Sequence, residues 1–224
     1  METPLHYFTV VPKLPPKLKP LEEMAYNLLF SWDAEIRGLF RRLDPHLWEL
    51  SGHNPVWMLS RLKRERIREL EKDEAFISYM ERTYERFRQY LQRPAFTPYA
   101  DLKGRLRIGY FSAEYGLTDC LPFYHGGLGV LAGDMLKSAS DLDIPMVGVG
   151  LLYQFGAFRQ ELTFEGEQKE RIPELDFYHM PLRLQRNEGG EPLLIKGRKV
   201  LRPFGAGRFD IPHQAEFRFE SAHQ

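Results

Sequence analysis

His125-Gly126-Gly127-Leu128-Gly129-Val130-Leu131-Ala132-Gly133-Asp134 is the stretch that decides the fold. A strand-like run over 106–113 precedes it, the pattern of 127–142 predicts a helix, and the apolar run over 144–153 predicts a second strand. Strand, glycine turn, helix and strand form a βαβ unit. We expect its connection to be right-handed and its second strand to be buried on both faces.

The glycine turn at 124–129 falls outside the carboxyl ends of these strands, where ligands of such sheets bind. Glycines let the backbone approach a ligand closely and leave N–H groups free at a helix start. Those donors suit a phosphate or the oxygens of a sugar phosphate. A purely structural turn is the alternative interpretation, and the turn alone leaves both open.

The region before the turn has a helical pattern. An apolar stripe from Leu21 to Leu43 predicts helix, with a break at Asp44-Pro45 and a new helix start at Pro55. From Val56 to Tyr90 the chain predicts two charged amphipathic helices divided near Lys72-Asp73.

We therefore expect a helical region over 1–95, followed by a partial α/β domain over 96–224. Within the second part, alternation over 180–186 and 192–201 around the turn at 187–190 predicts a hairpin.

Six aromatic side chains of the helical region could stack on sugars or pack in a core. Their helical spacing favours packing. They are Tyr26, Phe30, Trp32, Phe40, Trp48 and Trp57.

The composition excludes several classes of protein. Basic and acidic residues balance at 31 each, which argues against nucleic-acid binding. The single cysteine, Cys120, rules out an intramolecular disulfide and is interpreted as a structural residue rather than a nucleophile. No signal peptide or membrane-spanning run is recognisable, so a cytoplasmic location is expected. No metal site is predicted.

Several motifs together resemble the α-glucan (glycogen/maltodextrin) phosphorylase family, in its shorter bacterial and archaeal branch. The resemblance spans roughly residues 20–200. The motifs that carry it are Ala25 to Trp32, Leu39 to Pro45, His53 to Val56, Tyr110 to Leu117, Leu121 to Asp134, Leu136 to Leu142, Pro145 to Tyr153 and Gly156 to Gln160.

The resemblance implies a glycosyltransferase of two Rossmann-like α/β domains, of which this chain is the N-terminal part with a helical extension. It implies transfer of a glucosyl unit from an α-1,4-glucan to inorganic phosphate, giving glucose 1-phosphate. The family uses pyridoxal phosphate, whose own phosphate exchanges protons with the substrate phosphate. Its Schiff-base lysine is expected in a C-terminal domain outside this chain, so we expect the chain to be inactive alone.

Carried over residue by residue, the substrate and phosphate donors are Gly126, Gly127 and Leu128. Glu114 could bind polar ligand groups or brace the loop, and bracing is favoured. His125 stands where animal and plant phosphorylases have Asn, and it could face the substrate. No residue of this chain is assigned a catalytic role, and Lys137 is not nominated as the cofactor lysine.

Two residues depart from the pattern of the larger phosphorylases. Gly116 stands where they have a Tyr near the cofactor, and Val130 replaces an Arg after the loop. The tail beyond about Val200 does not resemble the family's continuation, which suggests truncation or a change of reading frame. Whether the chain forms homo-oligomers stays open.

Three other interpretations are kept. One is an ADP-glucose-dependent glycogen or starch synthase-like fragment, against which the long helical extension argues. A second is a gene product that does not fold independently. The third is a non-catalytic glucan-binding module using Tyr115, Tyr124, Tyr153 and Phe155.

Overall fold

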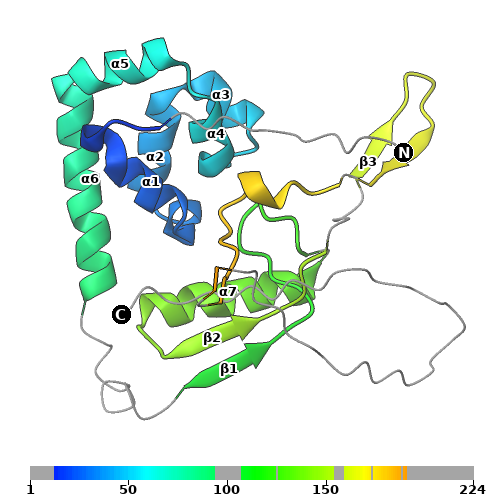
Figure 1. Cartoon of the computed structure of the whole chain (residues 1–224). Coiled ribbons are helices and arrows are strands. Elements are labelled where there is room, and N and C mark those ends of the chain that lie inside the picture. The colour runs from blue at the N-terminus through cyan, green and yellow to red at the C-terminus, as the bar shows by residue number, and fades with distance from the viewer. Residues whose placement is uncertain are drawn as a thin grey trace, which may run out of the picture. The chain divides into compact units, whose positions relative to one another are not determined.

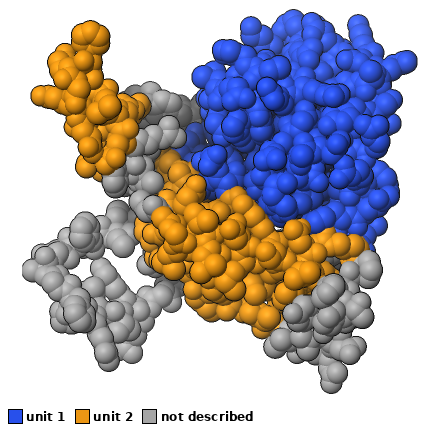
Figure 2. Space-filling model, turned by 180° about the vertical axis from the view of Figure 1, so that it is seen from behind, with its two compact units in different colours: residues 1–92, 118–121, 176–181 blue, residues 93–117, 122–175, 182–224 orange. Residues whose placement is uncertain are grey.

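The computed structural model describes residues 13–93, 107–124, 126–153, 159–172, 174–187 and 189–190. The chain divides into two compact units, coloured separately in Figure 2. Unit 1 comprises 1–92, 118–121 and 176–181, and unit 2 comprises the remaining residues. The predicted boundary between residues 95 and 96 stays a prediction.

Unit 1 is helical in its described residues (Figure 1). Its α-helices are α1 (Lys19–Ala25), α2 (Ala34–Leu43), α3 (Pro45–Leu50), α4 (Pro55–Arg61), α5 (Arg64–Lys72) and α6 (Glu74–Gln92). Its 3-10 helices are η1 (Pro16–Leu18), η2 (Leu28–Ser31) and η4 (Phe177–His179).

Side-chain caps fix the start of several of these helices. The Asp44 carboxylate accepts a bond from the Leu47 N–H at 2.9 Å, and the Asn54 side-chain oxygen accepts one from the Trp57 N–H at 3.0 Å. Prolines follow both caps, at a position where a missing N–H has no cost. The predicted break at Asp44-Pro45 and the helix start at Pro55 are confirmed.

The stripe from Leu21 to Leu43 is not one helix but three short ones, α1, η2 and α2. Asn27 caps η2 and Asp33 caps α2, each with a side-chain oxygen that accepts backbone N–H groups. Apolar spacing alone does not reveal such interruptions, because the buried face continues across them.

The prediction of two helices between Val56 and Tyr90 is wrong, because the structure has three, α4, α5 and α6. The division at Lys72-Asp73 is confirmed, since α5 ends there and the Asp73 carboxylate accepts the Phe76 N–H at 3.0 Å. A second division occurs at Leu62, whose backbone is extended and which ends α4.

The core of unit 1 contains three of the six aromatic side chains. Phe30, Phe40 and Trp48 are buried. Phe40 stacks on Trp48 at 6.1 Å between ring centroids and meets Phe30 edge-on at 6.5 Å. The packing interpretation is confirmed for these three, and Tyr26, Trp32 and Trp57 are half-buried.

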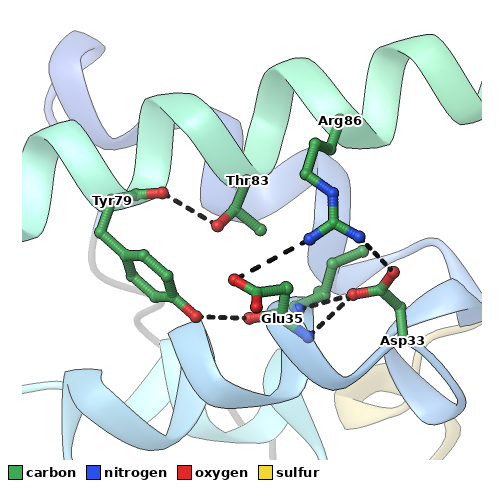
Figure 3. A network of polar contacts seen from close by, with 6 residues as sticks. Asp33, Glu35, Tyr79, Thr83 and Arg86 are labelled. Carbon is green, nitrogen blue, oxygen red and sulfur yellow. Dashed lines mark hydrogen bonds and ion pairs between the residues drawn. The ribbon is translucent and has the colours of Figure 1, made fainter.

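Polar contacts join α2 to α6 at the edge of this core (Figure 3). The Arg86 guanidinium lies 3.8 Å from the Asp33 carboxylate and 3.9 Å from that of Glu35. The Tyr79 hydroxyl donates to the Glu35 carbonyl at 3.1 Å, and the Thr83 hydroxyl donates to the Tyr79 carbonyl at 2.9 Å. Half-exposed ion pairs of this kind contribute little, so buried apolar packing carries the stability of unit 1.

Unit 2 contains the predicted βαβ unit. Strand β1 (Ile108–Phe111) pairs in parallel with β2 (Met146–Val149), with Ile108 opposite Met146 and Phe111 opposite Val149. Helix α7 (Gly127–Asp141) connects them and lies alongside the pair (Figure 1). The element types and their order are confirmed, although the strands are shorter than predicted. The handedness of the connection stays a prediction.

The prediction that β2 is buried on both faces is wrong. Of its residues only Gly148 is buried, and Phe111 on β1 is 75% exposed. The described residues provide two parallel strands, whereas a parallel sheet is normally covered on both faces. The described residues of unit 2 therefore contain a helix and a small parallel sheet. They do not contain the wider sheet of a Rossmann-like domain.

The hairpin lies elsewhere than predicted. Strands β3 (Arg159–Leu162) and β4 (Gln168–Arg171) pair antiparallel, with Gly166 in the turn at φ +82°. The predicted turn before Gly190 does form, since the Gly190 N–H donates to the Asn187 carbonyl at 2.9 Å. No strand covers 180–186, however, and the predicted second strand at 192–201 lies outside the described residues.

Candidate functional site

The glycine turn forms the start of α7. Gly126 is the N-cap residue, and its carbonyl accepts the Val130 N–H at 3.1 Å. A glycine cap brings no side-chain acceptor, and the first N–H groups of a helix have no intrahelical partner. Gly126, Gly127 and Leu128 are exposed, so their amides form an open helix N-terminus.

Neither backbone strain nor packing among the described atoms requires glycine at the first two positions. Gly126 has φ −170°, an extended conformation open to any residue. A Cβ added to Gly126 or Gly127 would meet no described atom within 4 Å.

Two further glycines of the motif have the opposite environment. A Cβ on Gly129 or Gly133 would lie within 3.0 Å of existing atoms, from Tyr124 and Gly116 respectively. The Gly116 N–H donates to the Gly129 carbonyl at 2.7 Å. Helix α7 therefore packs backbone against backbone on the segment that follows β1. The Gly-x-x-x-Gly spacing of Gly129 and Gly133 is the signal in the sequence for this contact.

Gly116 is also restricted by this packing. A Cβ there would lie 3.1 Å from the Val130 Cα and 3.2 Å from the Gly129 carbonyl oxygen. A tyrosine, as the larger phosphorylases are expected to have here, would require α7 to move. Glycine in place of tyrosine at position 116 thus allows α7 to approach this segment closely.

Glu114 lies beside the first turn of α7. Its Oε2 is 3.1 Å from the position that a Cβ on Gly129 would occupy. The Ser112 hydroxyl donates to the Glu114 carbonyl at 2.8 Å, which fixes the backbone of this segment. This position fits loop bracing and ligand contact alike, so its role stays a prediction. His125 lies outside the described residues.

The described aromatic residues of the glucan-binding alternative do not form an open stacking surface. Tyr115 is buried, Tyr124 and Tyr153 are half-buried, and Phe155 lies outside the described residues. Burial raises the pKa of the Tyr115 hydroxyl, which keeps it a protonated donor at neutral pH.

An apolar pocket beside Tyr115 has a volume of about 20 Å³, room for a water molecule and not for a sugar. It lies within unit 2. Its lining is Tyr115, Leu117, Phe123, Gly150, Leu151, Leu152 and Leu182.

Cys120 has no nucleophilic character. It is 8% exposed, and burial raises the pKa of its thiol to about 12. A thiol is reactive as the thiolate, so the structural interpretation is confirmed. Across the described ranges, no three His, Cys, Asp or Glu side chains gather as a metal site would need. None of the described helices is long and apolar enough to cross a membrane.

Two family models match consecutive parts of the chain. Residues 14–121 match a family described as a protein of unknown function (DUF3417), and residues 123–207 match "Carbohydrate phosphorylase". The second match includes the glycine turn and α7. No solved structure matches the chain.

Curated relatives extend this result. The glycogen phosphorylase of Mycobacterium tuberculosis is 42% identical over 198 residues, which are 86% of this chain and 23% of the relative. The maltodextrin phosphorylase of Thermococcus litoralis is 42% identical over 187 residues, 82% of this chain and 22% of the relative. The glycogen phosphorylase of Aquifex aeolicus is 39% identical over 150 residues, 67% of this chain and 21% of the relative.

The chain thus spans less than a quarter of the length of these curated relatives. The similarity nevertheless covers most of the chain and joins the helical region to the βαβ unit. Over these residues the chain belongs to the carbohydrate phosphorylase family and corresponds to a portion of a glycogen or maltodextrin phosphorylase.

Proposed function

We propose that this chain supplies the phosphate-binding glycine turn of an α-1,4-glucan phosphorylase, a cytoplasmic enzyme that transfers a glucosyl unit to inorganic phosphate and yields glucose 1-phosphate. The names of the relatives support glycogen or maltodextrin as the glucan. In this proposal residues 1–95 form a helical region. Residues 96–224 begin a Rossmann-like α/β domain whose further strands, like the C-terminal domain, lie outside this chain.

The observation that carries the proposal is the open start of α7. Gly126 and Gly127 are exposed, and a Cβ added at either would meet no described atom within 4 Å. Gly129 and Gly133, by contrast, are explained by packing. A helix N-terminus with exposed N–H groups stabilises a phosphate dianion, and fixed donors need no rearrangement during the reaction.

Each predicted site residue has a role in this proposal. The amides of Gly126, Gly127 and Leu128 donate to phosphate oxygens and to the glucosyl group. Glu114 braces the turn from the segment after β1, and His125 faces the substrate. This chain binds and orients the substrates, and none of its residues is assigned the transfer of a proton.

Pyridoxal phosphate is the cofactor that family membership implies. The described residues do not provide its attachment. Lys137, on α7 itself, lies ten residues beyond Gly127, or about 15 Å along the helix axis. We therefore assign the lysine that holds the cofactor to the remainder of the enzyme.

The experiment that tests the proposal joins this chain to the remaining part of the Thermococcus litoralis maltodextrin phosphorylase and measures glucose 1-phosphate formed from maltodextrin and phosphate. Gly127→Pro removes one N–H at the first helical position, where proline is tolerated. Gly127→Ala keeps that N–H and serves as the matched control.

We expect the proline variant to lose about 100-fold or more in rate, as when one preorganised donor is removed, and the alanine variant to lose far less. Equal rates for the two variants would contradict the proposal. Binding of maltodextrin without any effect of phosphate would instead favour the glucan-binding alternative.

A further inference from the structure

Tyr115 makes an unusual set of contacts for a residue in a loop after a strand. Its side chain is 5% exposed, and its hydroxyl donates to the carbonyl of Tyr110 on β1 and, at 3.3 Å, to the carbonyl of Val149 on β2. One hydroxyl thus contacts a backbone carbonyl near the carboxyl end of each of the two parallel strands.

Gly150, the residue after β2, provides the space for the Tyr115 ring. A Cβ on Gly150 would lie 2.9 Å from two ring carbons, and a Cβ on Gly148 would lie 3.4 Å from a third. The Tyr110 ring meets the Tyr115 ring edge-on, with 6.0 Å between centroids. The ring is therefore held on two sides, and only a residue without a side chain fits beneath it.

The backbone around Tyr115 extends the same connection to α7. The Tyr115 N–H donates to the Phe123 carbonyl at 3.3 Å, and the next N–H, of Gly116, donates to the Gly129 carbonyl at 2.7 Å. Gly129 is the third residue of α7. Two consecutive residues therefore join the carboxyl ends of β1 and β2 to the first turn of the helix.

We propose that Tyr115 is a positioning residue for the glycine turn: it fixes the amides of Gly126, Gly127 and Leu128 relative to the carboxyl ends of β1 and β2. That the turn binds phosphate rests on the proposed function. That Tyr115 connects the two strands to α7 does not depend on it. Donors to a developing charge are effective only when they are held in place, and an element supporting them determines how well they are held.

The hydroxyl is the part of Tyr115 that a substitution can remove cleanly. Tyr115→Phe keeps the ring and its packing on Gly148 and Gly150 and removes the donor to both strands. Tyr110→Phe is the matched control, because it removes a hydroxyl from the neighbouring ring, for which the structure shows no hydrogen bond among the described residues.

Two measurements on this chain test the inference. The first is amide hydrogen exchange of Val130 and Leu131, in the first turn of α7. The second is the dissociation constant for inorganic phosphate, read from the amide resonances of Gly126 and Gly127. Loss of one net hydrogen bond predicts exchange three- to tenfold faster in Tyr115→Phe, roughly the equivalent of 0.5–1.5 kcal/mol. It predicts phosphate binding weaker by a similar factor, with neither change in Tyr110→Phe.

Equal behaviour of the two variants would overturn the inference. So would a uniform rise in exchange across β1, β2 and α7, which marks a general loss of stability rather than a local one. If the unaltered chain shows no response to phosphate, the proposed function fails, and hydrogen exchange alone decides the role of Tyr115.

A second variant guards against failure of Tyr115→Phe to fold. Gly150→Ala keeps the hydroxyl and places a methyl group where the ring now lies, 2.9 Å from two of its carbons. It should displace the ring and raise exchange in the first turn of α7. Unchanged exchange in Gly150→Ala would contradict the link between this ring and the turn.

Discussion

The helical unit and the βαβ unit bury their apolar residues very differently. In the helical unit Leu39 and Phe40 are completely buried. In the βαβ unit Phe111 is 75% exposed, Leu128 62% and Leu131 59%. The helical unit has a core formed by described residues. The βαβ unit exposes apolar side chains, among them Leu128 and Leu131 near the turn that we propose binds phosphate.

The helix starts of the two regions are stabilised by different contacts. The starts of α2, α3 and α4 in unit 1 are fixed by the side-chain caps Asp33, Asp44 and Asn54. The start of α7 has no side-chain cap and is fixed by backbone contacts at glycine instead. A helix start that binds a ligand must keep its N–H donors free. Its stabilisation therefore has to come from contacts that do not use these donors, such as the packing of Gly129 and Gly133.

Removal of a core ring should give the largest effect, in the helical unit. Phe40→Ala creates a cavity beside Phe30 and Trp48, and we expect a loss of about 3–5 kcal/mol in the free energy of unfolding. Urea unfolding followed by tryptophan fluorescence measures it. Leu50→Ala, at a side chain 64% exposed, is the control and should change stability by less than about 0.5 kcal/mol. Similar losses in both variants would contradict a core at Phe40.

Crowding at a glycine should give the next effect, in the βαβ unit. An alanine at Gly133 would place a Cβ 2.6 Å from the Gly116 carbonyl carbon, and we expect a loss of about 1–3 kcal/mol. Hydrogen exchange in α7 is the measurement. Gly127→Ala adds the same methyl group in open space and should leave exchange unchanged. If the two alanines behave alike, close packing of α7 on the segment after β1 is not what requires glycine.

Loss of a cap should cost less. Asn54 caps α4, and its side-chain amide donates to the His179 carbonyl at 2.8 Å. Asn54→Ala should therefore lower stability by about 1–2 kcal/mol, while Asn54→Ser keeps a capping oxygen and loses the bond to His179. Thermal unfolding of the two variants separates these contributions. An alanine variant as stable as the serine variant would show that the cap is unimportant.

The smallest effect on stability at neutral pH is expected for Cys120, whose burial is read from its chemical reactivity. Its folded pKa of about 12 lies above that of a free thiol, near 8.5, so its stabilising contribution is present below pH ~8.5 and is lost as the pH rises toward 12. Alkylation at pH 8 should be slow in the folded chain and fast in urea. Fast alkylation of the folded chain would show that 118–121 is not packed as described.

Local signals in the sequence explain the parts of the fold that were predicted correctly. Asp44-Pro45, Pro55 and Lys72-Asp73 each carry a capping or helix-breaking residue, and the glycine turn marks α7. These features act over a few residues and can be read without knowledge of the partners.

Contacts between distant residues explain what was not predicted. The hydroxyl of Tyr115 reaches Val149, 34 residues away, and nothing near Tyr115 in the sequence indicates this. The β3–β4 hairpin is fully charged on one face, with an ion pair of 3.8 Å between Glu161 and Arg171, and it lacks the apolar alternation that marks strands. Exposure of β2 depends on how much of the sheet is present, which its own residues do not encode.

The measurement that tests the central claim most directly is a titration of the glycine-labelled chain with inorganic phosphate, followed by the amide resonances of its glycines. The account predicts saturable shifts at Gly126 and Gly127, and none at Gly52 and Gly166, turn glycines with positive φ in other parts of the chain. Absence of saturable shifts at Gly126 and Gly127, or equal shifts at all four, would contradict phosphate binding at the start of α7.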